Sequence, residues 1–302
     1  MWDSICYLNG TYLPLADAKI SVLDRGFIFG DGVYEVAPLY FGKPFEWAGH
    51  LARLKRSLGG ISLANPLSDA QWGELVHTLA ARNPSHAPHQ FIYWQISRGV
   101  AKRDHAFPTA DTTPTVFAMS TPFVPPSESP RGTLLDTGVA AISTVDNRWL
   151  RCDIKSISLL GNVLKRQEAV DAGAAEVIMF RDGMLTEGAA ANIWVVKNGV
   201  VAGPPRDQHI LTGIRVGLMQ RLCDSAGLRL ETRPITKAEV FAADELMLSS
   251  ATKEILPITV LDERPVSLGA SAGKPGPVWR MLFSAYQAEK ALQCPPNQAA
   301  SI

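Results

Sequence analysis

Two short β-hairpins in the second half of the 302-residue chain constrain its fold most strongly. Asp-Gly or Asn-Gly between apolar runs is the strongest short signal for a hairpin. One hairpin covers residues 176–187 and turns at Asp182-Gly183, and the other covers residues 192–202 and turns at Asn198-Gly199. Such antiparallel neighbours, with helices elsewhere, predict a mixed α/β (α+β) fold. The strict strand–helix alternation of a dinucleotide-binding fold is absent from the sequence, and no G-x-G-x-x-G opens a helix.

The charge balance argues against several kinds of partner. Lysine plus arginine and aspartate plus glutamate each number 29, and the sequence has no basic stripe of the kind that binds nucleic acid. No apolar run approaches the ~20 residues needed to cross a bilayer. The N-terminus, MWDSICYLNG, lacks the basic and apolar regions of a signal peptide. We therefore expect a cytoplasmic protein with no nucleic-acid or membrane partner.

The cysteines and histidines do not suggest metal chemistry. No Cys-x-x-Cys pair occurs, and the six histidines show no paired ligand spacing. A disulfide framework is not expected in a reducing compartment. We expect ordinary free thiols at four widely separated positions, which are Cys6, Cys152, Cys223 and Cys294.

A stretch rich in Pro, Ser and Gly, TPFVPPSESPRG at residues 121–132, indicates a boundary between two domains. We expect a small N-terminal α/β domain over residues 1–122, a linker over 123–132 and a larger C-terminal domain over 133–302. Apolar patterns and caps predict strands at 19–23, 32–41, 90–97, 115–120, 139–143 and 245–249, and helices at 49–58, 68–81, 162–172, 212–225 and 278–292.

Two ionisable residues with small or apolar neighbours could carry chemistry. Lys155 lies in the segment RCDIKS, and a desolvated lysine can form a Schiff base with an aldehyde. Glu187 precedes the small residues 189–191, which leave room for a flat ligand beside a carboxylate. A carboxylate near a pyridine nitrogen keeps that nitrogen protonated. Taken alone, each residue is better explained as a solvated side chain of a strand or hairpin.

Other residues are candidates for binding anions. The segment Thr212-Gly213-Ile214 opens a predicted helix whose free N–H groups could hold a phosphate, or Thr212 could be a simple cap. The hydroxyl-bearing segment 249–252 could be a phosphate site or a plain loop. Arg53 could add a cation or lie on a solvated helix face. Arg103 and His105 could clamp a carboxylate or form a polar loop.

The order of these signals along the chain resembles the class IV (fold type IV) pyridoxal-phosphate aminotransferases. Within that family the chain is most similar to the D-amino-acid aminotransferases, from about Tyr7 to Gln287. The resemblance implies a small N-terminal α/β domain and a larger C-terminal domain with a β-barrel-like core. The segments that carry it are DRGFIFGDGVYE at 24–35, RCDIKSISLLGNVLKRQE at 151–168, Thr186-Glu187-Gly188 with Asn192, and Gly213-Ile214.

The resemblance assigns the cofactor, pyridoxal 5′-phosphate, to a defined set of residues. Lys155 matches the lysine that forms the Schiff base and then shuttles the α-proton. Glu187 matches the partner of the pyridine nitrogen, and Leu211 the side chain packed on the ring face. By the same resemblance, the phosphate is bound by the Arg53 side chain, by the backbone N–H groups of Ile214 and Arg215, and by the segment at Ser250 and Ala251.

The resemblance also implies the substrates and the oligomer. Tyr34, Arg103 and His105 match the trap for a substrate carboxylate, with Arg103 and His105 reaching in from the partner subunit of a homodimer. The reaction implied is amino transfer between a D-amino acid (the D-alanine, D-glutamate or D-aspartate class) and a 2-oxo acid. The R-x-H pattern at 103–105 separates these enzymes from the branched-chain L-enzymes.

Three positions depart from the family pattern. Arg215 and Ala251 stand where threonines are usual, and residues 189–191 are alanines where serines are common.

The alternatives to a D-amino-acid aminotransferase are a branched-chain L-amino-acid or (R)-amine transaminase, or an aminodeoxychorismate-type lyase. Outside the enzymes, the chain could be a non-catalytic protein that binds pyridoxal phosphate or a structural oligomer.

Overall fold

The computed structural model describes residues 4–84, 88–130 and 134–296. The chain divides into two compact units, and neither is continuous in sequence. Unit 1 comprises Met1–Phe123, Ile154–Leu159 and Ala291–Ile302, and unit 2 comprises Val124–Asp153 and Leu160–Lys290. The first division lies beside the Pro-rich stretch. The sequence predicts one boundary at that stretch. In the structure, the segment that carries Lys155 belongs instead to the same unit as the N-terminal residues.

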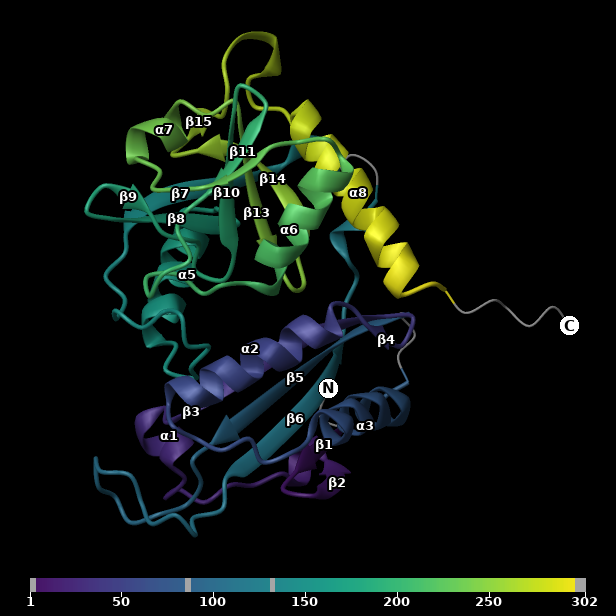
Figure 1. Cartoon of the computed structure of the whole chain (residues 1–302), viewed down its shortest axis with the longest axis vertical. Helices are drawn as coiled ribbons and strands as arrows, with labels where there is room; N and C mark the ends of the chain where they lie inside the picture. Colours follow the sequence, from purple (N-terminus) through teal and green to yellow (C-terminus); the bar gives the residue numbers. More distant parts are fainter. Residues whose placement is uncertain (1–3, 85–87, 131–133, 297–302) are drawn as a thin grey trace, which may run out of the picture. The chain divides into compact units, whose positions relative to one another are not determined.

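Unit 1 is built on one antiparallel sheet with the strand order β2-β1-β6-β5-β3-β4 (Figure 1). The long helices α2 and α3 supply leucines and Trp72 to the core that covers this sheet. The strands are β1 (Ile5–Leu8), β2 (Thr11–Pro14), β3 (Gly32–Tyr40), β4 (Lys43–Pro44), β5 (His89–Ser97) and β6 (Thr115–Pro122), and the helices are η1 (Leu15–Asp17), α1 (Arg25–Phe29), α2 (Trp47–Gly60) and α3 (Asp69–Arg82).

Most of the elements predicted for unit 1 are confirmed, and their local causes are visible. The helix predicted at 68–81 is α3. It begins with a capping box in which Ser68 and Gln71 satisfy each other's backbone N–H groups. The strand predicted at 19–23 is wrong, because this segment is irregular and exposes Val22. It leads instead into α1, whose first turn is capped by the Asp24 carboxylate accepting from the N–H of Gly26 at 2.8 Å.

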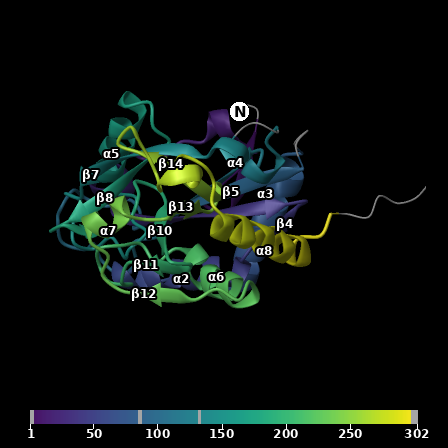
Figure 2. The same cartoon turned by 90° about the horizontal axis from the view of Figure 1, so that it is seen from above.

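Unit 2 is built on a nine-stranded mixed sheet with the order β12-β11-β10-β13-β14-β7-β8-β9, and β15 pairs with β14. Figure 2 shows these strands following an arc from β8 through β14 and β13 to β12. The strands are β7 (Val139–Val145), β8 (Glu176–Arg181), β9 (Met184–Leu185), β10 (Asn192–Lys197), β11 (Val200–Gly203), β12 (Leu230–Thr232), β13 (Glu245–Ser250), β14 (Glu254–Leu261) and β15 (Arg264–Pro265).

Helices and short 3-10 turns complete the second half of the chain. The helices predicted at 162–172 and 278–292 are confirmed as α5 and α8, with bounds shifted by one or two residues. In the described part of the chain, no helix has the length and apolar character required to cross a membrane. The helices are η2 (Pro126–Glu128), α4 (Leu134–Thr137), α5 (Leu160–Asp171), α6 (Ile214–Ser225), α7 (Lys237–Phe241), η3 (Gly269–Ser271) and α8 (Pro277–Gln293).

Both predicted hairpins are present in unit 2. Asp182 and Gly183 have φ values of 51° and 75°, and Asn198 and Gly199 have φ values of 51° and 75°. Two successive positive φ angles define the type I′ turn, which matches the twist of the flanking strands. The second strand of the first hairpin is shorter than predicted and ends at Leu185.

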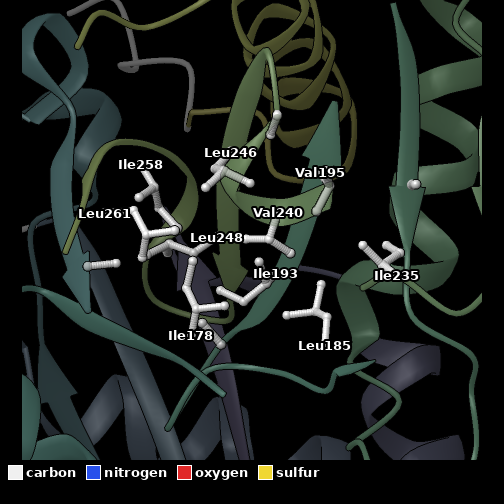
Figure 3. Packing of buried hydrophobic residues seen from close by; sticks show 14 of the residues in the cluster. Ile178, Leu185, Ile193, Val195, Ile235, Val240, Leu246, Leu248, Ile258 and Leu261 are labelled. Carbon is white, nitrogen blue, oxygen red and sulfur yellow. The ribbon is translucent and has the colours of Figure 1, made fainter. Parts of the chain in front are cut away.

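The sheet of unit 2 curls until its two edges are linked. The N–H of Leu185 in β9 donates to the carbonyl of Ile235, which follows β12, at 2.8 Å, and the N–H of Lys237 donates to the carbonyl of Gly183 at 2.9 Å. The enclosed side chains form an apolar core from β8, β10, β13 and β14 (Figure 3). The barrel-like core expected from the family resemblance is therefore present.

Candidate functional site

In unit 2, the carboxylate of Glu187 is buried and fully engaged. The backbone carbonyl of Glu187 accepts from the N–H of Met179 in β8 at 3.0 Å, which fixes the start of the side chain. The carboxylate then accepts hydrogen bonds from Arg148 Nη1 at 2.7 Å, from the N–H of Leu211 at 3.2 Å and from Asn192 Nδ2 at 3.4 Å. Glu187 is thus a held, buried carboxylate and not a solvated hairpin residue.

Arg148 links Glu187 to a second buried carboxylate, Asp146. Its Nε and Nη2 donate to the two oxygens of Asp146 at 3.0 and 2.9 Å. Thr186 Oγ1 donates to the same carboxylate at 2.8 Å, and Arg181 lies 3.2 Å from it. Sequence reasoning missed Arg148. The spacing Asp146-x-Arg148 directly after the predicted strand at 139–143 was the available signal.

Burial acts to raise the pKa of both carboxylates, but the net shifts of the two groups are opposite. Burial raises the pKa of Glu187 to about 7, and the opposing charge and hydrogen bond of Arg148 do not offset it. Burial also acts to raise the pKa of Asp146, but two hydrogen bonds and the charge of Arg148 outweigh it and lower the pKa to about 2. Near neutral pH, Asp146 is ionised, and Glu187 can hold a proton or a negative charge.

The segment that leads into α6 is hydrogen-bonded to Glu187. Leu211 donates its N–H to Glu187 and accepts from Asn192 through its carbonyl at 3.0 Å. Two residues later Gly213 is the N-cap of α6, with no side-chain cap. The helix therefore begins at Ile214 and not at Thr212 as predicted. Because Gly213 has no side chain, the first N–H groups of α6 stay available to an anion.

The remaining cofactor candidates of unit 2, Ser250 and Ala251, lie at the end of β13, the strand that pairs with β10. Asn192, which contacts Glu187, is the register partner of Ser249. Ser250 ends β13, and Ala251 begins the turn that leads to β14. Ala189 and Ala191 are buried, and the N–H of Ala189 donates to the carboxylate of Glu176 at 3.0 Å.

In unit 1, the segment of Lys155 is held along the first residues of β3. The N–H of Lys155 donates to the hydroxyl of Ser57 in α2 at 3.1 Å, and its carbonyl accepts from the N–H of Tyr34 at 3.0 Å. Ser156 forms a bridge with Val33. The Lys155 Nζ lies 4.0 Å from the centroid of the Tyr34 ring. Lys155 and Tyr34, both predicted from the sequence, are thus brought together.

Arg53 is buried in α2 and bound by a carboxylate that sequence reasoning did not consider. Its Nε and Nη2 donate to the two oxygens of Glu35 at 2.6 and 2.8 Å. The same carboxylate lies 2.9 Å from Nδ1 of His50. Burial would raise the pKa of Glu35, but the charge and hydrogen bonds of Arg53, with His50, lower it to about 2. Among the described residues, Nη1 of Arg53 has no hydrogen-bond partner.

Arg103 and His105 lie on an exposed loop between β5 and β6. The guanidinium carbon of Arg103 is 5.5 Å from the centroid of the Phe29 ring, and the imidazole of His105 is 5.4 Å from it. The two side chains are therefore brought together over one ring. In the part of the chain that the structure covers, neither forms a hydrogen bond with Tyr34 or Lys155.

Comparisons with known proteins agree on one family. A family model described as amino-transferase class IV matches residues 32–261. A D-alanine aminotransferase of Bacillus licheniformis is 38% identical over 92% of this chain and 94% of its own. One from Staphylococcus epidermidis is 37% identical over 93% and 96%. The fold is similar to that of a branched-chain amino acid aminotransferase of Escherichia coli, with a TM-score of 0.84, 23% identity and coverage of 99% of this chain and 97% of the other.

Proposed function

Because this chain belongs to the class IV aminotransferases, we propose that it moves the amino group of a D-amino acid to a 2-oxo acid. The single observation that carries this proposal is its similarity, over more than nine-tenths of its length, to D-alanine aminotransferases. D-alanine, D-glutamate and D-aspartate are the candidate donors. The geometry of Lys155 and Glu187 supports the reaction class, since the backbone of Lys155 is hydrogen-bonded to Ser57 and the carboxylate of Glu187 is buried and bound by Arg148.

The residues present fit pyridoxal 5′-phosphate, the cofactor of this family. Glu187 offers a buried carboxylate whose pKa of about 7 suits a hydrogen bond with a ring nitrogen. The α6 N-terminus offers the N–H groups of Ile214 and Arg215 to the phosphate, and Gly213 places no side chain over them. Arg53 would add a cation at the phosphate, and Ser250 with Ala251 would add further contacts to it. Lys155 would supply the amine, and Leu211 would pack against the ring.

When bound, the cofactor supplies an electron sink for the pair left when the α-proton is removed. Lys155 would take that proton on its Nζ and return it, which requires an amine with a defined direction. The hydrogen bonds to Ser57 and Tyr34 fix the backbone of Lys155, and its Nζ lies 4.0 Å from the centroid of the Tyr34 ring. This chain has Arg215 and Ala251 where threonines are usual in the family, so two hydroxyl donors are absent. A backbone N–H remains at each position.

Substrate selection would follow from where the carboxylate is held. With the carboxylate fixed by Tyr34, Arg103 and His105, the α-hydrogen of one enantiomer points at Lys155. We place Arg103 and His105 in the site of the partner subunit of a homodimer. The exposed aromatic rings of Phe27 and Phe107 near this loop favour burial against a second copy. The cytoplasmic location expected from the sequence stays a prediction.

The absorption spectrum of the purified protein, loaded with pyridoxal 5′-phosphate, tests the proposal. We expect D-alanine to convert the visible band of the bound cofactor into that of pyridoxamine 5′-phosphate, while L-leucine leaves it unchanged. A band that responds only to L-leucine would keep the family and Lys155 and overturn the assignment of Arg103 and His105. A protein that binds no cofactor would overturn the enzymatic proposal.

A further inference from the structure

Two buried arginines of unit 1 share one carboxylate beside the loop that carries Arg103 and His105. Nε of Arg25 and Nε of Arg98 each donate to Oδ2 of Asp31 at 2.8 Å. Arg25 is 3% exposed and Arg98 is 6% exposed. Burial would raise the pKa of Asp31, but the hydrogen bonds of Arg98 and Arg25 hold it below its usual range. The cluster is therefore two cations around one anion.

The cluster reaches the backbone of the loop through Arg25. Its Nη1 donates to the carbonyl of Asp104 at 2.7 Å, and Asp104 is the residue between Arg103 and His105. The N–H of Arg25 donates to the carbonyl of Gly99 at 2.9 Å, at the start of the same loop. Arg25 thus holds both the entry of the loop and the peptide at its centre.

Each of the two arginines also lies over an aromatic ring. The guanidinium of Arg25 lies 4.9 Å from the centroid of Phe29, the ring that also lies beside Arg103 and His105. The guanidinium of Arg98 lies 3.7 Å from the centroid of Phe107, which follows them in the loop. Its Nη2 donates to the carbonyl of Ile61 at 2.6 Å, which ties it to the end of α2.

We propose that Arg25, held by Asp31, is a positioning residue for the substrate carboxylate. It sets the conformation of the peptide at Asp104, so that the flanking side chains Arg103 and His105 point the same way. The inference rests on the proposed function, because the trap itself is part of that proposal. Only a planar guanidinium can donate to Asp31 and to the Asp104 carbonyl while stacking on Phe29. A lysine keeps the charge and loses this geometry.

The test compares Arg25→Lys with wild type, with Arg82→Lys as matched control. Arg82 also stacks on an aromatic ring, Tyr12 at 4.4 Å, and lies in α3 away from the loop. We expect Arg25→Lys to raise KM for D-alanine roughly 10- to 100-fold, as for the loss of a hydrogen bond to a charged group, with kcat within about threefold. The slow reaction with D-alaninol, which lacks the carboxylate, should be unchanged. Equal losses with both amines, or an unchanged KM, would overturn the inference.

Hydrogen exchange of the loop amides gives an answer that does not need activity. Arg25→Lys should speed exchange at residues 101–107 at least tenfold, and Arg82→Lys should not. Unchanged exchange would overturn the inference even if KM rises. A wild-type enzyme that ignores D-alanine would instead refute the proposed function, and the exchange result would still decide whether Arg25 orders the loop.

Discussion

Replacing Arg148 with methionine tests the buried charges around Glu187. The side chain of Arg148 is 4% exposed, and its two partners are Asp146 at 0% and Glu187 at 7%. Methionine fills a similar volume and removes the three hydrogen bonds to these carboxylates, together with a longer one to the carbonyl of His209 at 3.4 Å. Breaking a buried ion pair by removing one partner lowers the free energy of unfolding by about 3–5 kcal/mol. Arg181 stays beside Asp146 and limits the loss there.

The loss should depend on pH in a direction set by Glu187. Its pKa is about 7 with Arg148 present, and removing the cation raises it further. Above pH 7 the folded variant therefore holds a proton that the folded wild type has released. The destabilisation then grows with pH, by about 1.4 kcal/mol for each unit. Between pH 7 and pH 8.5 we expect it to increase by about 2 kcal/mol.

Urea unfolding of the apoprotein, followed by tryptophan fluorescence, measures both quantities. Arg233→Met is the matched control, because Arg233 also pairs with two carboxylates, Glu231 and Glu239, but its side chain is 40% exposed. We expect the control to lose about 1 kcal/mol or less, independent of pH in this range. A loss below 1 kcal/mol for Arg148→Met at pH 8.5, or one that does not change with pH, would refute the reasoning.

Three further substitutions follow from the site. Lys155→Ala should abolish amino transfer from D-alanine, and borohydride should no longer fix the pyridoxyl group to the peptide that spans this position; undiminished turnover would contradict the assignment. Arg103→Ala should weaken D-alanine binding by roughly 2–5 kcal/mol, seen as a higher KM, and an unchanged KM would remove it from the trap. Glu35→Gln leaves Arg53 without its carboxylate and should lower the free energy of unfolding by about 3–5 kcal/mol at pH 7. Because the pKa of Glu35 is lowered to about 2, its stabilisation is present above pH 4.5 and is lost as the pH falls towards 2, so acid unfolding of variant and wild type should converge there.

The parts of the fold that local chemistry determines were predictable from the sequence. The two-residue turns at Asp182 and Asn198 and the cap at Ser68 depend only on residues a few positions apart. The strand β14 was missed for a local reason as well. Pro257 lies in its middle and argues against a central strand, yet β14 pairs with both β13 and β7. The pairing of β14 with β7 also shifts register between Ile258 and Val260.

The supports of the candidate residues were not predictable in the same way. Lys155, Glu187 and Arg53 were identified by residue type and order. What holds them lies far along the chain, as with Arg148, which is 39 residues from Glu187. Arg25 and Asp104 are 79 residues apart. A single sequence does not show which of its 29 basic residues becomes buried, because burial depends on how distant segments pack.

The grouping of Ile154–Leu159 with unit 1 limits how this enzyme can be recombined with its relatives. The lysine and the three carboxylate-trap candidates belong to unit 1, whereas Glu187 and the α6 N-terminus belong to unit 2. A single crossover at the Pro-rich stretch would separate Lys155 from Tyr34 and Ser57, the residues that hold its backbone. A chimera meant to exchange substrate preference needs at least three breakpoints, so that the short lysine segment travels with the N-terminal sheet.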